Sequence, residues 1–432
     1  MYFPLKITLN KTNMKSLTIL LWLNISFFLA TVRFVLARFG IVDGPIRSIL
    51  LFSITLIPFI FLLAGVKGDK NFISQNITPF FYLYASIVII FLISLFSNPQ
   101  LSVFYFRNDY GIGPVFCFDG AIYAFLIFSI CSDPLHLINI LIKTAYIKFF
   151  YLIVVVFIPA MIRGYWIDIA PGGGTMEFSY SLSFGYDMLF PLTVCLVAWF
   201  DNHKIVHLII AFSSAILIVT NGGRGAILCL VLFMVLLFIN RIIEKRVSMT
   251  KIILLIIIMF FLGAFLFILK DYFLSLIVNV LSISKISSRS LEMIVNGTFS
   301  DSNGREQIWN TVVDAIRTGG PFGYGLFGDR PFVSPLHVAG YSHNLFLELL
   351  VSFGIIGVVC IIYILIDAIR MIFFCKDKNW RLIYIVLFIC SCKLFLSLSL
   401  WYVWEFWAAA AVAYKYKVLV KKNLNEIQKN TD

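Results

Sequence analysis

The sequence carries little charge for its length. Of its 432 residues only 13% are Asp, Glu, Lys or Arg, and 61% are hydrophobic. A soluble domain has about 25% charged and roughly 45–50% apolar residues. The apolar residues occur in runs of about 17–25, the length that a helix needs to cross a hydrocarbon core of about 30 Å. The composition excludes a soluble fold and predicts one membrane domain over residues 1–432.

Several signatures of other protein classes are also missing. The chain has no Gly-x-x-x-x-Gly-Lys-Ser/Thr loop for a nucleotide, and no Asp-x-Asp in the segments that we assign to the outside, which argues against a metal-dependent site. The eight cysteines lie in apolar runs or at their inner ends, so they predict neither disulfides nor a zinc site. No cleavage site follows the first apolar run, which we expect to be retained. We expect no metal and no cofactor.

Hydropathy predicts an all-α polytopic membrane protein of about twelve transmembrane helices, at residues 16–37, 48–66, 79–97, 112–132, 145–162, 184–200, 205–220, 225–240, 252–269, 344–369, 382–400 and 402–416. Because Lys and Arg favour cytoplasmic segments, the basic clusters at 241–251, 370–381 and 415–429 predict that both termini are cytoplasmic. In this orientation 21 of the 34 basic residues lie inside, 12 outside, and Lys393 within a span.

The basic residues differ in kind between the two sides. Seventeen of the 21 inner ones are lysines, whereas ten of the 12 outer ones are arginines, at positions 33, 38, 47, 107, 163, 224, 289, 305, 317 and 330. A planar guanidinium can bind phosphate or carboxylate through two hydrogen bonds. The outer surface is therefore predicted to hold an anion. We attribute the net charge of +12 to topology and lipid headgroups rather than to nucleic acid.

One outer loop, of about 73 residues at 270–342, is too long to be structureless. An amphipathic helix at about 304–318, lying on the membrane surface, is predicted by the apolar spacing of Ile308, Trp309, Val312, Val313 and Ile316. Asn303 is its expected N-cap and Glu306 occupies the capping-box position. Arg305 then lies in the first turn, where it either binds an anion or only reaches the lipid headgroups.

Two further outer elements carry chemistry. Arg224 ends a Gly-rich turn at 220–225 and begins a helix, so it either binds a ligand close to the backbone or is only a boundary arginine. His343 begins the tenth span and can accept a proton, unless it is a cap or surface residue. Glu348 lies about one turn further on, where it can orient the imidazole or act as the base.

Two ionisable residues fall within predicted spans. Asp119 and Lys393 each lie roughly seven residues, or about 10 Å of helix, from an outer end. We expect them to form an ion pair between the fourth and eleventh spans. A proton relay is the alternative that a transporter would require.

Three ordered motifs resemble one known family. Asn221-Gly-Gly-Arg224-Gly-Ala is followed by Gly304-Arg305-x-x-x-Trp309 and Pro321-Phe-Gly-Tyr-Gly325, and then by His343-Asn-x-x-x-Glu348-x5-Gly354-Ile-Ile-Gly357. Together they resemble the O-antigen polymerase and O-antigen ligase superfamily over about 210–360. The resemblance implies a glycosyltransferase of the C-type membrane fold in the bacterial inner membrane, using a glycan on undecaprenyl diphosphate as donor at the periplasmic face. It implies that Arg224 and Arg305 bind the diphosphate and that His343 assists the acceptor hydroxyl.

The resemblance leaves the acceptor open. Polymerases are associated with Arg-x10-Gly motifs in two periplasmic loops, and the chain has this spacing at Arg163…Gly174 and Arg317…Gly328, besides an accidental Arg33…Gly44. Arg163, Arg317 and Arg289 are therefore expected to bind substrate, together with Glu348. A polymerase extends the next lipid-linked repeat unit, with a possible chain-length regulator as partner. A ligase transfers the glycan to the lipid A core of lipopolysaccharide, and a lipid-linked oligosaccharide flippase or transporter is the third alternative.

Overall fold

The computed structural model describes residues 11–41, 44–107, 110–169, 175–178, 181–245, 304–337 and 340–429. The first half contains the helices α1 (Lys11–Leu23), α2 (Ile25–Arg38), α3 (Pro45–Val66), α4 (Lys70–Phe72), α5 (Thr78–Ser97), α6 (Ser102–Tyr105), α7 (Ile112–Phe116), α8 (Tyr123–Ser129), α9 (Pro134–Tyr151) and α10 (Ile158–Arg163). A short antiparallel hairpin follows, with β1 (Trp166–Ile169) paired to β2 (Thr175–Phe178).

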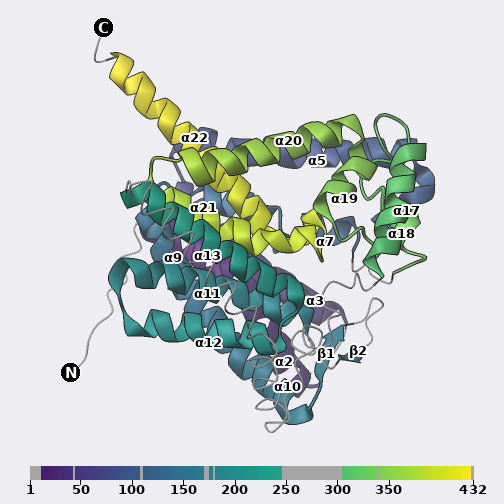
Figure 1. Cartoon of the computed structure of the whole chain (residues 1–432), viewed down its shortest axis with the longest axis horizontal. Coiled ribbons are helices and arrows are strands. Elements are labelled where there is room, and N and C mark those ends of the chain that lie inside the picture. Colours follow the sequence, from purple (N-terminus) through teal and green to yellow (C-terminus); the bar gives the residue numbers. More distant parts are fainter. Residues whose placement is uncertain are drawn as a thin grey trace, which may run out of the picture.

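The second half contains α11 (Leu182–Asn202), α12 (Ile205–Asn221), α13 (Arg224–Lys245), α17 (Arg305–Thr318), α18 (Arg330–Val333), α19 (Leu345–Phe353), α20 (Ile355–Ile369), α21 (Lys378–Ser391) and α22 (Trp404–Lys429). In Figure 1 the long helices α9, α11, α12 and α13 run side by side through the bundle. The shorter α17, α18 and α19 form a separate group at one end of the molecule.

The described residues contain six helices long and apolar enough to cross a membrane, and up to seven if the bent pair α1–α2 counts as one span. The number of about twelve is therefore not confirmed, although the protein is helical and has several apolar helices of spanning length. The predicted span 252–269 lies outside the described residues, as do Arg289 and Asn303.

Four of the predicted spans are interrupted in the structure. The predicted span 112–132 consists of α7 and α8, which are separated by a turn at residues 117–122. α1 and α2 meet at Asn24 with a bend of 61°. The predicted span 344–369 is divided into α19 and α20 at Gly354, whose φ of +53° suits glycine. The helix of the predicted span 382–400 ends at Ser391, and residues 392–403, which include only short 3₁₀ turns, separate α21 from α22. At such breaks, backbone groups inside the bundle lose their helical hydrogen bonds and can bond to side chains instead.

The span around Lys148 is longer than predicted. α9, a π-helical turn at Leu152–Phe157, and α10 form one apolar segment of 30 residues, Pro134–Arg163. Lys148 therefore lies near the middle of a helix of spanning length, whereas its charge had placed it among the 21 basic residues of the inner segments. α11 is the most enclosed of the long helices, with 72% of its apolar window buried. It packs against α9, α12, α13 and α21.

A loop joins α17 to the break in the tenth predicted span through main-chain hydrogen bonds. The amides of Tyr324 and Gly325 donate to the carbonyls of Val351 and Ser352 at 2.9 and 2.8 Å, and the Ile355 amide donates to the Pro321 carbonyl at 2.9 Å. A Cβ at Gly354 would lie 2.1 Å from the Pro321 oxygen. The loop and the broken helix are therefore in backbone contact, which fixes where α17 lies.

Candidate functional site

A network of buried polar side chains lies where α18, α19 and residues 392–403 meet. Arg330, only 2% exposed, donates from Nη1 to both carboxylate oxygens of Asp329 at 3.0 and 3.1 Å. Its Nη2 donates to Ser399 Oγ at 3.3 Å and lies 3.7 Å from Glu348 Oε1. The Ser399 hydroxyl donates to Glu348 at 2.5 Å, and the Leu400 amide donates to its other oxygen at 3.2 Å. One guanidinium thus connects two buried carboxylates.

His343 lies next to this network of polar side chains, and its backbone is in the left-handed region, at φ +52°. Its Nδ1 is 2.9 Å from the Ser397 carbonyl oxygen, and its Nε2 is 3.4 Å from Nδ1 of His337. A carbonyl can only accept, so Nδ1 carries the proton and Nε2 is left as an acceptor, which faces His337 Nδ1. The helix cap of α19 is the neighbouring Asn344, which accepts from two backbone amides. His343 is therefore free of a capping role.

Arg305 reaches the same short segment from the first turn of α17. Its Nη2 is 3.5 Å from Ser397 Oγ. The Trp309 indole donates to the Ser342 carbonyl at 3.2 Å, so the helix is also attached to the residue before His343. The apolar face of α17 buries Ile308, Val312 and Ala315 against α18 and α19. The predicted helix thus packs on protein with this face rather than lying with it on the membrane surface.

Arg224 begins α13 close to the same serine. A Cβ at the next residue, Gly225, would lie 1.9 Å from the hydroxyl of Tyr186 on α11. That hydroxyl is 3.1 Å from Ser397 Oγ. Only glycine allows the start of α13 to approach Tyr186 so closely. Ser397 therefore links His343 and Arg305 directly and the Arg224 turn through Tyr186.

The other predicted substrate-binding residues lie elsewhere. Arg317 is on the exposed side of α17, where its side chain is 75% exposed and pairs with Asp314 at 3.4 Å. Arg163 is exposed at the end of α10, with its guanidinium 5.8 Å from the Tyr165 ring. Glu348, by contrast, is buried at the site, where it bonds to Ser399 and Leu400 and lies next to Arg330. The Ser397 carbonyl, rather than Glu348, holds the His343 imidazole.

Burial sets the protonation of the two central groups. It lowers the pKa of His343 to about 4, with the Ser397 carbonyl opposing the shift and the nearby His337, Arg305 and Arg330 adding to it. Burial, followed by the Asp329 carboxylate, raises the pKa of Glu348 to about 7, although Arg330 opposes this change. At neutral pH the imidazole is therefore uncharged and able to accept a proton.

Sequence reasoning missed four contributors: Asp329, Arg330, Ser397 and Ser399. Arg330 was only one of ten outer arginines, and the two serines were hidden inside an apolar run. The sequence Asp329-Arg330 could have indicated this network, since an acidic residue next to an arginine in a long loop can form an ion pair with it. The serines carried none, because their role depends on where residues 392–403 leave the helix.

The predicted ion pair between Asp119 and Lys393 is wrong. Lys393 Nζ bonds to Glu405 Oε1 at 3.0 Å, and both side chains are buried. Asp119 is exposed, in the turn between α7 and α8. The partner of Lys393 comes from the start of α22 because residues 392–403 fold back between the two helices.

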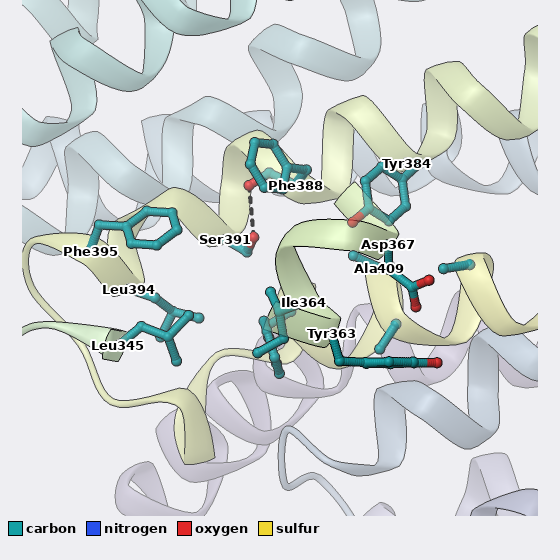
Figure 2. A pocket seen from close by; sticks show the side chains of 13 residues that line it. Leu345, Tyr363, Ile364, Asp367, Tyr384, Phe388, Ser391, Leu394, Phe395 and Ala409 are labelled. Atoms are coloured by element: carbon teal, nitrogen blue, oxygen red, sulfur yellow. Dashed lines mark hydrogen bonds between the residues drawn. The ribbon is translucent and has the colours of Figure 1, made fainter. Parts of the chain in front are cut away.

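An apolar cavity of about 70 Å³ extends from this region between α20, α21 and α22. Figure 2 shows Leu345, Leu394 and Phe395 at one end, and Tyr363, Asp367 and Tyr384 at the other. Leu345 follows His343 by two residues, and Phe395 precedes Ser397 by two. One end of the cavity is therefore lined by sequence neighbours of His343 and Ser397, and the rest lies along the apolar helices.

Comparison with known proteins gives one match. Residues 209–362 match a family model described as O-antigen ligase. This range includes α12, α13, α17, α18 and α19, and with them Arg224, Arg305, Arg330, His343 and Glu348. The comparisons with curated proteins and with solved structures give no match.

Proposed function

We propose that this chain, a member of the O-antigen ligase and polymerase superfamily, is the polymerase that transfers an undecaprenyl-diphosphate-linked glycan onto the next lipid-linked repeat unit. The reaction takes place at the periplasmic face of the bacterial inner membrane, and both termini are cytoplasmic. The C-type fold with about twelve spans and a large periplasmic loop at 270–342 is part of this proposal. The match to the O-antigen ligase family by itself supports a role in surface polysaccharide synthesis.

The contact of three separate segments at Ser397 is the observation that carries the proposal. Arg305 and His343 bond to Ser397 directly, and Gly225 touches Tyr186, which bonds to it as well. Transfer of a glycan from a diphosphate to a hydroxyl group needs a guanidinium beside an uncharged imidazole. The first holds the anion and the second accepts a proton.

Arg305 supplies the charge for the leaving group. Breaking a glycosyl–diphosphate bond develops negative charge on the diphosphate, which fixed guanidiniums stabilise. Within the described residues, the Arg305 guanidinium donates its only hydrogen bond to the neutral hydroxyl of Ser397. Its charge is therefore available to a diphosphate oxygen. Arg224, at the N-terminus of α13, adds a second guanidinium at the positive end of a helix dipole.

His343 supplies the base. Its Nε2 accepts the proton of the acceptor hydroxyl while that oxygen attacks the anomeric carbon. Attack from the side opposite the diphosphate inverts that carbon. His337, whose Nδ1 is 3.4 Å from Nε2, is placed to take part in moving the proton away. The apolar cavity that begins at Leu345 suits the first isoprene units of the donor.

The ligase is the second candidate because the matching family model is described as O-antigen ligase. The two Arg-x10-Gly spacings favour the polymerase, with Arg163, Arg317 and Arg289 as further substrate contacts at the loops. A flippase is the third alternative. A chain-length regulator is a proposed partner of the polymerase.

A deletion strain separates the three. We expect the ladder of polymer to disappear while single repeat units are still attached to the lipid A core, because polymerisation alone is lost. Bare core with polymer left on the carrier lipid would identify the ligase. Absence of lipid-linked units at the periplasmic face would identify a flippase. The readout is the lipopolysaccharide pattern on gels together with analysis of the carrier lipids, with the wild-type gene restored on a plasmid as control.

A further inference from the structure

A second cavity, of about 160 Å³, lies between the α1–α2 junction, α9, α11 and the start of α22. Its polar lining consists of Asn24, Ser26, Lys148, Tyr151, Asp187 and Glu405. It contains no residue of the polar cluster around Ser397. The reaction proposed above does not use it.

Two buried oxygen atoms on its lining lack a hydrogen-bond donor among the described residues. Glu405 is 4% exposed, and its Oε1 accepts from Lys393 while its Oε2 has no partner. Asn24 is 2% exposed, and its Nδ2 donates to the Leu20 carbonyl at 2.7 Å while its Oδ1 has no partner. Buried polar atoms are nearly always bonded. Two such acceptors on one cavity indicate that something donates to them.

The cavity also holds a cation and an anion without a hydrogen-bonded partner in the described part of the chain. The Lys148 ammonium lies 4.7 Å from the Trp404 ring centroid and 5.0 Å from that of Phe190, and makes no ion pair there. Asp187 lines the same cavity and is exposed. Ring faces stabilise an ammonium only partly. Lys148 therefore has N–H groups for an acceptor, and Asp187 has oxygens for a donor.

The balance of charge limits the ligand. Lys148 and Lys393 carry two positive charges, and Asp187 and Glu405 carry two negative ones, so the group is neutral. A lone ion would leave one charge uncompensated inside the apolar bundle, which is costly. A ligand that carries both signs would not. Lys148 and Asp187 belong to helices of spanning length, and Asp187 is exposed where it lines the cavity, so a ligand can reach it.

We propose that this cavity binds the headgroup of a zwitterionic phospholipid with a primary ammonium, as in phosphatidylethanolamine. Lys148 donates to the phosphate. The three N–H groups of the ammonium match the three acceptors, Asp187, Glu405 Oε2 and Asn24 Oδ1. A quaternary choline headgroup has no N–H for these oxygens, and an anionic glycerol headgroup brings a net charge.

The test uses the purified full-length chain and native mass spectrometry, with phosphatidylethanolamine, phosphatidylcholine and phosphatidylglycerol of identical acyl chains. We expect one phosphatidylethanolamine to stay bound under activation that removes the other two lipids. Asp187→Asn and Lys148→Met should each weaken its retention about tenfold, the effect of losing one charge-assisted hydrogen bond. The matched controls are Asp201→Asn on the same helix as Asp187, and Lys143→Met on the same helix as Lys148, both exposed.

Equal retention of the three lipids would overturn the proposal, and so would unchanged retention in both cavity variants. A high-resolution map with only ordered water in the cavity would overturn it as well. The comparison of headgroups needs only the wild-type protein, so it holds even if a variant fails to fold. Glycan transfer is not measured, so this result is independent of the proposed function.

Discussion

Two arginines on neighbouring elements bond to serines only two residues apart, yet their surroundings differ. Arg330 at the start of α18 is 2% exposed and faces two carboxylates, Asp329 and Glu348. Arg305 at the start of α17 is half-buried, and among the described residues its guanidinium bonds to the uncharged Ser397. One guanidinium is neutralised by the protein and the other is not.

The difference separates a structural charge from a ligand-binding one. A buried guanidinium with two carboxylates is already paired, so a phosphate would have to compete with them. A half-buried guanidinium beside a hydroxyl can add an anion without displacing a protein carboxylate. We therefore propose that Arg305 binds substrate and that Arg330 joins α18, α19 and residues 392–403. Two experiments test this proposal, and a third compares the two candidate bases of the same site.

Replacing Arg330 has the largest expected effect. Arg330→Met leaves Asp329 and Glu348 buried without their cation, which should lower the free energy of unfolding by about 3–5 kcal/mol. The measurement is thermal or denaturant unfolding of the purified protein in detergent. Arg317→Met, at an exposed ion pair, serves as control and should change stability by less than about 0.5 kcal/mol. If both variants are equally stable, Arg330 is not the structural charge.

Replacing Arg305 should remove activity but not stability. Arg305→Ala, and likewise Arg224→Ala, should lower glycan transfer by about 10²–10³-fold, since each removes a donor aimed at the leaving group. Lysine should restore little, because a point charge lacks the two-pronged contact. The measurement is the amount of polymer formed by membranes that contain equal amounts of each inserted variant. The exposed Gln307→Ala on the same helix is the control. Wild-type activity in Arg305→Ala would exclude it from the mechanism.

The third experiment distinguishes the two candidate bases by pH. Because burial lowers the pKa of His343 to about 4, its imidazole stays neutral as pH falls below the ordinary 6.5. Transfer that depends on this base should persist at pH 6 and decline only as pH approaches 4. If Glu348 is the base, with its pKa raised to about 7, activity should already decline near neutral pH. The pH profile of transfer in vesicles is the measurement, with the exposed His203→Gln as control.

The sequence predicted apolar helices well and their interruptions poorly. α3, α5, α11, α12 and α13 lie where hydropathy places spans. Asn24, Gly354 and residues 392–403 break helices inside apolar runs, where a window of hydropathy changes little. Lys148 looked like the boundary of a span because its charge is unusual in lipid. Its cavity and the rings of Phe190 and Trp404 explain why it is tolerated.

The residues of the site were predictable only in part. Arg224, Arg305 and His343 could be selected by residue type, glycine context and side of the membrane. Arg317 and Arg330 could not be told apart in this way, because the sequence does not show that one meets Glu348 and the other solvent. Ser397 has no sequence signature. Its importance arises from three distant segments that meet on it.

The junction between the loop at 321–325 and the broken helix α19–α20 is made of peptide groups. Such a junction makes few demands on side-chain identity, so most residues on either side can change over evolution without displacing Arg305. Glycine is the exception, because a methyl group at Gly354 would run into the Pro321 oxygen. Divergent sequences can therefore keep the same placement of α17 while sharing little besides a few glycines.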